Sequence, residues 1–576
     1  MTTTVADTIA LVLKNHGVTE VFGQSLPSAF FLATARHGIR QVSYRTENAG
    51  GAMADGYARM TNRIGVVGAQ NGPAATLLVP PMAEALKASV PLLALVQEVP
   101  TDATDKNAFQ EFDHYKLFDG VSKWIRTLTD PSRTQEYVEA ALRTATSGRP
   151  GPVVLLLPKD VLRMPAPEPT PPLQPLGGYP LDRTRPAGQS VRAAAALIAA
   201  EPRTVVVAGG GVHLSAAVPE LVELQELASL PVATTNMGKG AVSELHELSL
   251  GVVGSAMGGQ SPQFGVRQFL QEARLVVLVG SRTNENGTDS WRLLPRDAQF
   301  VHIDVDSTEI GRNYPSHRVP GDAKLALHDL LDELKSMDLS RREAARPELV
   351  REIAAARSTG PVTPVEATDA QGRLRPEHVA RVIDGLADEN TVLVADASYS
   401  TLWTTYYMTA RRAGQRFLTP RGLAGLGWGY PMALGAQVAN PDARVVCMSG
   451  DGGFGHVWSE LETAVREQLP VTLVLLNNSI LGFQKHAELV QFGEYTSAID
   501  FAPVDHAKIA EAVGVRAVRV STPAALEEAL QEAFRSKTAT LVEVITAPDA
   551  HPPITAWEPH ADVLEEREAP GAETSR

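Results

Sequence analysis

The sequence is poor in cysteine and has no long apolar run. Among its 576 residues Cys447 is the single cysteine, so a disulfide framework is excluded and a buried structural thiol is expected. No run of about 18 apolar residues occurs, so we expect no transmembrane helix. The first residues carry Asp7 and lack a basic region before their apolar stretch, which predicts a helix and not a signal peptide. We therefore expect a soluble cytoplasmic protein.

Positive charge is also scarce. The 52 Lys and Arg residues stand against 66 Asp and Glu residues, a formal net charge of −14, which disfavours nucleic acid and anionic membranes as partners. Hydrophobic and charged contents of 44% and 20% are those of a globular protein. The chain is too long for one core, so about three domains and a small-molecule substrate are expected.

Short apolar runs alternate with amphipathic segments along the chain, which predicts parallel, doubly wound sheets. A proline-dense stretch and a later charged helix followed by turn residues divide it. The expected fold class is α/β with three doubly wound parallel-sheet domains. The expected boundaries are a first domain at 1–165, a Pro-rich linker at 166–186, a middle Rossmann-like domain at 187–340, a second linker at 341–374, a third domain at 375–550 and a C-terminal tail or flap at 551–576.

Residues 444–484 carry the clearest chemical signal. The apolar run RVVCMS stops at Gly-Asp-Gly-Gly, an amphipathic helix is expected over residues 457–469, and the apolar run VTLVLL ends at Asn477 and Asn478. This unit places Asp451 and Asn478 at the carboxyl ends of two parallel strands, where ligands bind in open α/β sheets. A carboxylate, an amide oxygen and a loop carbonyl suit Mg²⁺ and leave room for phosphate oxygens. Either turn alone could be an ordinary loop, but the ordered pair is specific.

In this order and spacing, the two turns resemble the diphosphate-binding motif of thiamine-diphosphate enzymes. The similarity runs from end to end and is to the acetolactate synthase-like branch, with likeness also to benzaldehyde lyase and 2-hydroxyacyl-CoA lyases. The clearest stretches are ENAGGAMADGYAR, AFQEFD, SGRPGPVVLLLPKDV and GLGWGYPMALGAQVANPD. The resemblance implies that the first domain binds the aminopyrimidine, the third binds the diphosphate, and the middle one is structural or holds FAD or ADP. It also implies a homodimer or homotetramer with active sites between subunits.

The resemblance also assigns roles to individual residues. Glu47 matches the catalytic acid whose proton is shared with the aminopyrimidine, and apolar walls around it would raise its pKa. The Leu426 side chain would hold the cofactor in a bent form. The expected magnesium ligands are Asp451, Asn478 and the carbonyl of Ile480. The expected cofactor contacts are Ser400, Thr401, Ala424, Leu426, Gly452 and Gly453.

Around the substrate the chain departs from acetolactate synthases. Gln24 and Ser25 stand where those enzymes carry a Pro-Gly-Gly loop. Asn286 aligns with the arginine that receives the carboxylate of the second oxo acid, and Ala487 with the tryptophan that shapes the acceptor pocket. An amide cannot replace a guanidinium in recognising charge, so we expect an acceptor other than a second pyruvate. The expected substrate pocket comprises Gln24, Ser25, Phe109, Gln110, Asn286 and Ala487.

Four functions are compatible with parts of this pattern. A carboligase would decarboxylate a 2-oxo acid and transfer the acyl carbanion to a carbonyl acceptor, and a lyase would cleave an acyloin or a 2-hydroxyacyl-CoA. Both would share all the cofactor residues. A nicotinamide dehydrogenase is disfavoured because the glycines at 209–211 lack the G-x-G-x-x-G spacing and a following acid. A non-catalytic paralogue would have lost Glu47, Asp451 or Asn478. We expect the carboligase, with the lyase as the alternative.

Overall fold

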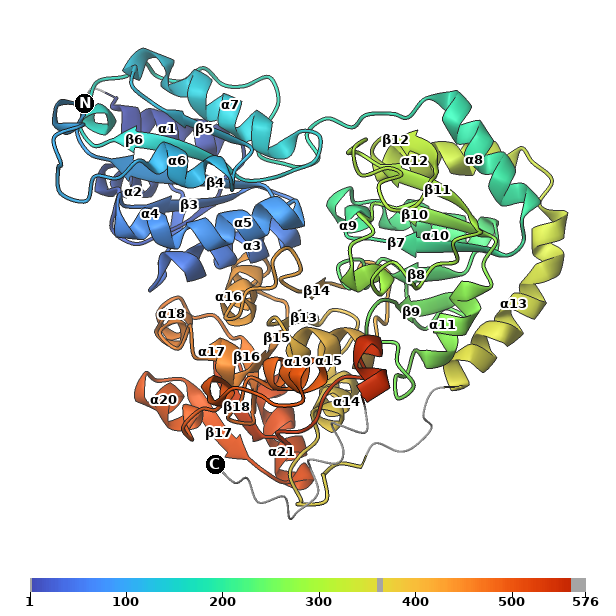
Figure 1. Ribbon diagram of the computed structural model, residues 1–576. Coiled ribbons are helices and arrows are strands. Elements are labelled where there is room, and N and C mark those ends of the chain that lie inside the picture. The colour runs from blue at the N-terminus through green and yellow to red at the C-terminus, as the bar shows by residue number, and fades with distance from the viewer. Residues whose placement is uncertain (1–2, 360–365, 561–576) are drawn as a thin grey trace.

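The computed structural model describes residues 3–359 and 366–560, which form three α/β domains (Figure 1). Each domain is built on a six-stranded sheet whose neighbouring strands run parallel. In Figure 1 the first domain is blue to cyan, the middle domain green to yellow, and the third orange to red. The predicted fold class is confirmed. None of the helices within the described ranges combines the length and the hydropathy that a membrane span requires.

The first domain has the strand order β2-β1-β3-β4-β6-β5. Helices α1, α2 and α7 pack on one face of the sheet, and α3 to α6 on the other. The strands are β1 (Glu20–Gly23), β2 (Arg40–Val42), β3 (Gly65–Ala69), β4 (Leu92–Glu98), β5 (Trp124–Thr127) and β6 (Val153–Pro158). The helices are α1 (Val5–Asn15), α2 (Ser28–Arg36), α3 (Glu47–Thr61), α4 (Pro73–Leu77), α5 (Val79–Ala88), α6 (His114–Asp119) and α7 (Thr134–Thr146).

The middle domain has the order β12-β11-β10-β7-β8-β9, which is the Rossmann order counted from its own first strand. The charged segment after residue 340 is the long helix α13, which packs on α11, so the first half of the expected second linker belongs structurally to this domain. The strands are β7 (Thr204–Ala208), β8 (Val232–Thr234), β9 (Ser249–Val252), β10 (Leu275–Val279), β11 (Gln299–Asp304) and β12 (His317–Pro320). The helices are α8 (Gly188–Ala200), α9 (Gly211–Leu214), α10 (Val218–Leu227), α11 (Phe264–Gln271), α12 (Ala323–Lys335) and α13 (Ser340–Ser358).

The third domain has the order β14-β13-β15-β16-β18-β17, which repeats the order of the first domain. The strands are β13 (Val392–Ala395), β14 (Phe417–Leu418), β15 (Val445–Gly450), β16 (Thr472–Asn477), β17 (Arg516–Val520) and β18 (Thr540–Ile545). The helices are α14 (Pro376–Leu386), α15 (Tyr399–Tyr407), α16 (Gly429–Ala439), α17 (Asp451–Phe454), α18 (Glu460–Arg466), α19 (Gly482–Phe492), α20 (His506–Ala512) and α21 (Pro523–Arg535).

The helix expected over residues 457–469 is wrong in its extent. After the short α17 the chain passes through successive turns, and α18 begins only at Glu460 and ends at Arg466. These turns bury Phe454 and Val457, which are 0% and 2% exposed, in the core beneath the sheet.

Helices α3 and α16 lie side by side between the first and third domains (Figure 1). Their backbones approach so closely that a Cβ added at Gly56 would lie 2.2 Å from the Met432 carbonyl oxygen. A Cβ at Gly435 would lie 1.9 Å from the Met53 carbonyl oxygen. One buried cluster continues from the first sheet through this contact into the third. The first and third domains therefore share a hydrophobic core.

The segment at residues 547–560 returns across the third domain to the middle domain, and we call it the C-terminal strap. The Gly258 amide donates to the Pro553 carbonyl at 3.0 Å, and the Thr555 amide donates to the Ser255 carbonyl at 2.9 Å. Its Trp557 ring packs on Phe483 of α19 with ring centroids 5.4 Å apart. Of the predicted tail or flap, residues 551–560 are thus packed between two domains, and residues 561–576 lie outside the described part.

Candidate active site

The carboxyl ends of β13, β15 and β16 surround a pocket in the third domain, which we call the diphosphate pocket. Strand order reverses between β13 and β15, the usual ligand position in open α/β sheets. The structure brings the three predicted magnesium ligands to this one pocket, and four of the predicted cofactor residues line it with them. These residues are Asp451, Asn478, Ile480, Ser400, Leu426, Gly452 and Gly453.

The charge and geometry of the diphosphate pocket suit a divalent cation. Burial raises the pKa of Asp451 to about 6, while nearby His506 and the Ser479 amide, 2.9 Å from Oδ2, favour its ionised form. A bound cation would offset the cost of burying this carboxylate. In the described ranges no three His, Cys, Asp or Glu side chains cluster as a metal site, so a cation here would depend on the Asn478 amide and the Ile480 carbonyl. That mixture of oxygen ligands fits Mg²⁺.

The two glycines after Asp451 are required by their protein neighbours. A Cβ at Gly453 would lie 2.0 Å from Oδ2 of Asp396, and one at Gly452 would lie 2.7 Å from the Leu481 side chain. Both values are far below van der Waals contact, so any larger residue would displace the pocket wall. The glycine turn thus lets Asp396 reach the base of the pocket.

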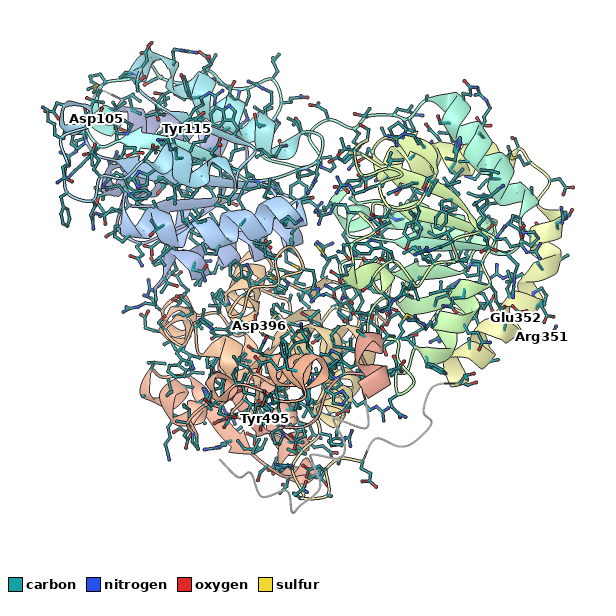
Figure 2. The ribbon with its side chains drawn as sticks, viewed as in Figure 1. Asp105, Tyr115, Arg351, Glu352, Asp396 and Tyr495 are labelled. Atoms are coloured by element: carbon teal, nitrogen blue, oxygen red, sulfur yellow. The ribbon has the colours of Figure 1, made fainter. Side chains whose placement is uncertain are left out.

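Asp396, which the sequence analysis missed, organises this wall (Figure 2). Its Oδ1 accepts hydrogen bonds from the amides of Ala397, Trp428 and Gly429 at 2.8–3.1 Å, and its Oδ2 accepts one from the Gly427 amide at 3.1 Å. Burial raises the pKa of this carboxyl, which is 1% exposed, and hydrogen bonds from the Ala397, Gly427 and Gly429 amides and the Ser449 hydroxyl oppose that shift. Its position directly after an apolar strand, like that of Asp451, was the available signal.

Two predicted cofactor residues do not line the diphosphate pocket. Thr401 is fully buried and its hydroxyl donates to the Asp396 carbonyl at 2.7 Å, so it supports the loop from behind. Ala424 lies on an exposed loop, residues 422–426, with a left-handed backbone (φ 60°). Only Leu426, at the end of that loop, reaches the pocket.

Glu47 is the first residue of α3, where burial raises its pKa. It does not line the diphosphate pocket of its own chain. Glu460 of α18 fixes the N-terminal end of α3, because its carboxylate accepts hydrogen bonds from the Thr46 amide at 3.0 Å and the Arg45 amide at 3.2 Å. The predicted acid and the predicted metal ligands therefore belong to two separate places in one chain.

The six predicted substrate residues are likewise dispersed over three domains. Phe109 is 85% exposed on the first domain, and the neighbouring Gln110 accepts from the Gln70 side chain at 2.6 Å. Gln24 donates to the Arg45 carbonyl at 2.7 Å, and Ser25 beside it is exposed. Ala487 is half-buried on α19 and Asn286 lies in the middle domain. A single chain therefore does not assemble this pocket.

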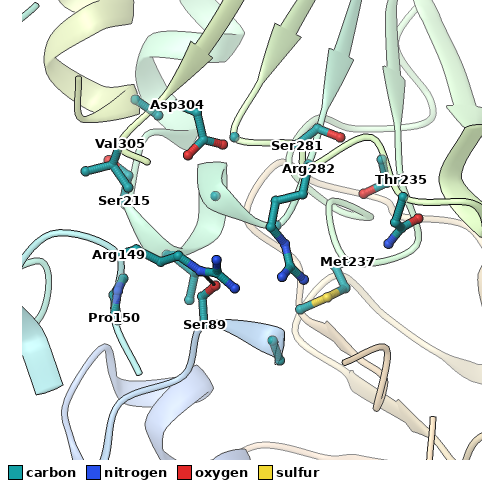
Figure 3. Close-up of a pocket in the computed structure, with 18 of the residues that line it drawn as sticks. Ser89, Arg149, Pro150, Ser215, Thr235, Met237, Ser281, Arg282, Asp304 and Val305 are labelled. Carbon is teal, nitrogen blue, oxygen red and sulfur yellow. Dashed lines mark hydrogen bonds between the residues drawn. The ribbon is translucent and has the colours of Figure 1, made fainter. Parts of the chain in front are cut away.

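A second pocket lies where all three domains meet, and we call it the three-domain pocket (Figure 3). Figure 3 shows the guanidinium groups of Arg149 and Arg282 and the carboxylate of Asp304 directed into the same space. Arg421 of the third domain and Asn286 also line it. Burial lowers the pKa of Arg282 and of Arg421, and neither guanidinium has a hydrogen-bond or ion-pair partner within residues 3–359 and 366–560. Of the residues that line this pocket, the sequence analysis had marked the glycines at 209–211 and Asn286.

Comparison with known protein families identifies the chain. Profiles of the thiamine pyrophosphate enzymes match three consecutive parts, namely the N-terminal TPP binding domain at residues 3–117, the central domain at 191–330 and the C-terminal TPP binding domain at 396–544. The chain belongs to the thiamine pyrophosphate enzymes. One match falls within each of the three domains. Thiamine diphosphate, the same compound as thiamine pyrophosphate, is the family's cofactor.

Similar proteins place this thiamine pyrophosphate enzyme in the acetolactate synthase-like group, as predicted. It is 34% identical over 543 residues to a probable acetolactate synthase large subunit of Methanococcus aeolicus, covering 92% of this chain and 89% of that protein. The corresponding protein of Methanocaldococcus jannaschii is 32% identical, with 94% and 92% covered. The chloroplastic acetolactate synthase of Arabidopsis thaliana is 32% identical, with 95% and 82% covered.

Proposed function

We propose that this enzyme decarboxylates a 2-oxo acid and transfers the acyl unit to a carbonyl acceptor. The observation that carries the proposal is the diphosphate pocket, where Asp451, Asn478 and Ile480 meet Leu426 in a chain of this family. The related acetolactate synthases favour this direction, and they give no support to the lyase alternative. A cytoplasmic location stays a prediction of the sequence.

The roles of the chain's residues follow from their positions. Thiamine diphosphate, when bound, supplies a thiazolium carbon that attacks the substrate carbonyl and an electron sink for decarboxylation. Asp451, Asn478 and the Ile480 carbonyl would hold Mg²⁺ against the diphosphate, with Leu426 against the rings. The raised pKa of Glu47 favours its keeping a proton at higher pH, as an acid that shares a proton with the aminopyrimidine requires.

A second copy of the chain would complete each site. Glu47 is not among the residues that line the diphosphate pocket of its own chain, and large apolar side chains are exposed on both the first and the third domain. Phe109 and Phe112 are 85% and 53% exposed on the first domain, and Leu423 and Phe483 are 56% and 43% exposed on the third. Pairing these surfaces across a two-fold axis would bury them and bring Glu47 to the partner's cofactor. A homodimer is the smallest such assembly, and a homotetramer contains two.

Complementation between two inactive variants tests the function and the shared site together. Glu47→Gln should abolish turnover while leaving thiamine diphosphate bound, and Asp451→Ala should weaken Mg²⁺-dependent cofactor binding. Mixed dimers of the two variants would contain one site with both lesions and one site with neither. Recovery of pyruvate decarboxylation on co-expression is therefore expected. No recovery would show that each chain carries its own complete site, and full activity of Glu47→Gln alone would remove the proposed acid.

Product analysis tests the reaction direction. The protein would be incubated with pyruvate, other 2-oxo acids, acyloins and 2-hydroxyacyl-CoAs, with products read by mass spectrometry. Carbon dioxide release together with a new carbon–carbon bond is expected from 2-oxo acids. Cleavage of an acyloin or a 2-hydroxyacyl-CoA without carbon dioxide release would replace the carboligase proposal with the lyase.

We also propose an acceptor larger than pyruvate. Phe483 and Ala487 lie one turn apart on α19, where acetolactate synthases carry a tryptophan at the position of Ala487. The small alanine leaves room beside the exposed Phe483 ring. Ala487→Trp should therefore lower turnover with bulky carbonyl acceptors more than with acetaldehyde, and an equal loss with both would contradict this view.

A nucleotide, FAD or ADP, is the proposed occupant of the three-domain pocket. Unpaired Arg282 and Arg421 suit a diphosphate, Asp304 suits ribose hydroxyl groups, and glycines 209–211 let a ligand approach the backbone. An absorption spectrum of the purified protein would detect a flavin, and chromatography of the denatured protein would detect ADP. Arg282→Met should release either nucleotide. Retention of normal nucleotide content by this variant would place the diphosphate elsewhere.

A further inference from the structure

Glu84 of the first domain holds a loop of the third domain of the same chain through hydrogen bonds to its backbone. Its side chain, at the middle of α5, is fully buried. Its Oε1 accepts the Gly422 amide at 2.7 Å, and its Oε2 accepts the amides of Leu423 and Ala424 at 2.6 and 3.3 Å. Three successive backbone N–H groups thus converge on one carboxylate, an arrangement that binds anions strongly.

A buried ion cluster fixes Glu84 itself. Arg59 of α3 lies 3.7 Å from Glu84 and donates to Asp55 at 3.0 Å. The same guanidinium donates to the Thr419 carbonyl at 3.0 Å, three residues before the loop. A buried carboxylate needs a compensating charge, and the Arg59 guanidinium supplies a positive charge beside Glu84. The cluster therefore joins the first domain to both ends of the Thr419–Ala424 stretch.

The backbone of the loop is shaped to this carboxylate. A Cβ at Gly422 would lie 2.5 Å from the Glu84 carbonyl oxygen and 2.8 Å from its Oε1, so only glycine permits the approach. Ala424 has a left-handed backbone (φ 60°), which residues with a side chain rarely adopt without support. The outer side of the loop remains open, since Leu423 is 56% exposed. Glu84 therefore fixes the loop's backbone from its buried side, while the other side of the loop remains accessible.

We propose that Glu84 is a positioning residue for the aminopyrimidine of the cofactor. It acts through the loop of residues 422–426, whose Leu426 has the proposed role of contacting the ring, and the inference rests on that role. By holding three amides in place before the cofactor arrives, Glu84 removes part of the ordering cost of binding. The diphosphate, held by Asp451 and Asn478 in a different part of the pocket, gains nothing from it.

Glu84→Gln tests this role because the amide keeps the shape of the side chain. Its NH₂ group would face one of the loop's N–H donors, leaving at least one of them unpaired. The affinity for thiamine diphosphate with Mg²⁺, measured calorimetrically on the apoprotein, should fall about tenfold. The affinity for inorganic pyrophosphate with Mg²⁺ should stay unchanged, because this probe lacks the ring. An equal loss for both probes, or a loss for neither, would overturn the proposal.

Asp55→Asn is the matched control, since Asp55 belongs to the same buried cluster but does not touch the loop. It should lower the thermal midpoint without changing the ratio of the two affinities. A changed ratio would assign the effect to the cluster as a whole and overturn a specific role for Glu84. Leu426→Ala separates this inference from its basis. If it leaves the thiamine diphosphate affinity intact, the proposed ring contact itself is wrong, whereas a loss there with none in Glu84→Gln refutes Glu84 alone.

Hydrogen exchange on the wild-type apoprotein gives a test that no folding defect can obscure. The amides of Gly422, Leu423 and Ala424 should exchange slowly without cofactor, although the loop is partly exposed. Exchange as fast as that of an unstructured loop would show that Glu84 does not hold them.

Discussion

Substituting Gly435 by alanine should push helices α3 and α16 apart and destabilise the contact between the first and third domains. The loss of stability can be worked out from the geometry of that contact. The new Cβ would lie 1.9 Å from the Met53 carbonyl oxygen, where real Cβ atoms stay beyond 3.0 Å, so the helices must part by at least 3.0 − 1.9 = 1.1 Å. The obstacle is backbone and cannot rotate away. Overpacking costs about 1–3 kcal/mol, and the upper end applies here. Alanine regains up to about 1 kcal/mol of helix preference, which leaves a net loss of about 2 kcal/mol.

The assay is thermal unfolding of wild type and variant, with Gly385→Ala as the matched control. Gly385 lies near the end of α14, and nothing lies within 4 Å of its added Cβ. The control should therefore increase the free energy of unfolding by about 0.5 kcal/mol and raise the thermal midpoint slightly. Gly435→Ala should lower the midpoint by about 2–4 °C for each kcal/mol lost. If Gly435→Ala melts at or above the temperature of Gly385→Ala, the contact between the domains is not as tight as the structure has it.

Three further predictions concern backbone strain at one residue and two buried charged groups. Ser398, which lines the diphosphate pocket, has φ 66° and ψ −140°, a backbone region that only glycine adopts without strain. Ser398→Gly should relieve about 1–3 kcal/mol of strain and raise the thermal midpoint, and a lower midpoint would contradict this. Lys239 is 1% exposed and pairs with Glu244 at 2.6 Å, so Glu244→Gln should leave the lysine charge unpaired and destabilise the protein by about 3 kcal/mol. Adding Lys239→Met should recover much of this loss of stability; if it does not, the unpaired lysine charge is not the cause of the loss. Burial raises the pKa of Asp304 to about 6, so the carboxylate that would accept hydrogen bonds from a ribose forms only as the pH rises through about 6. Nucleotide affinity, measured by binding titrations across this pH range, should rise with it, and Asp304→Asn should reduce that rise.

Strand positions were predictable because they depend on local apolar runs. RVVCMS and VTLVLL correspond to β15 and β16, and the polar residues that end them meet in the diphosphate pocket. The extent of α18 was not predictable, since the turns before it depend on where Phe454 and Val457 are buried. Asp396 and Glu84 escaped notice for another reason. Their partners are backbone amides far along the chain, which leave no trace in side-chain composition.

The proposed roles of Glu47 and of the substrate residues depend on a second copy of the chain, whereas the three predicted magnesium ligands already line one pocket. The sequence resemblance assigned these roles, and the structure distributes the residues over separate domains. Glu47 and Phe109 lie on the first domain and Ala487 on the third. Under the proposed function their mutual distances depend on a second copy of the chain, which no local sequence pattern describes.

The backbone contact between α3 and α16 also restricts how the molecule can deform. A hinge between the first and third domains would have to open a contact in which Gly56 and Gly435 leave no space for even a methyl group. Those two domains therefore move as one body.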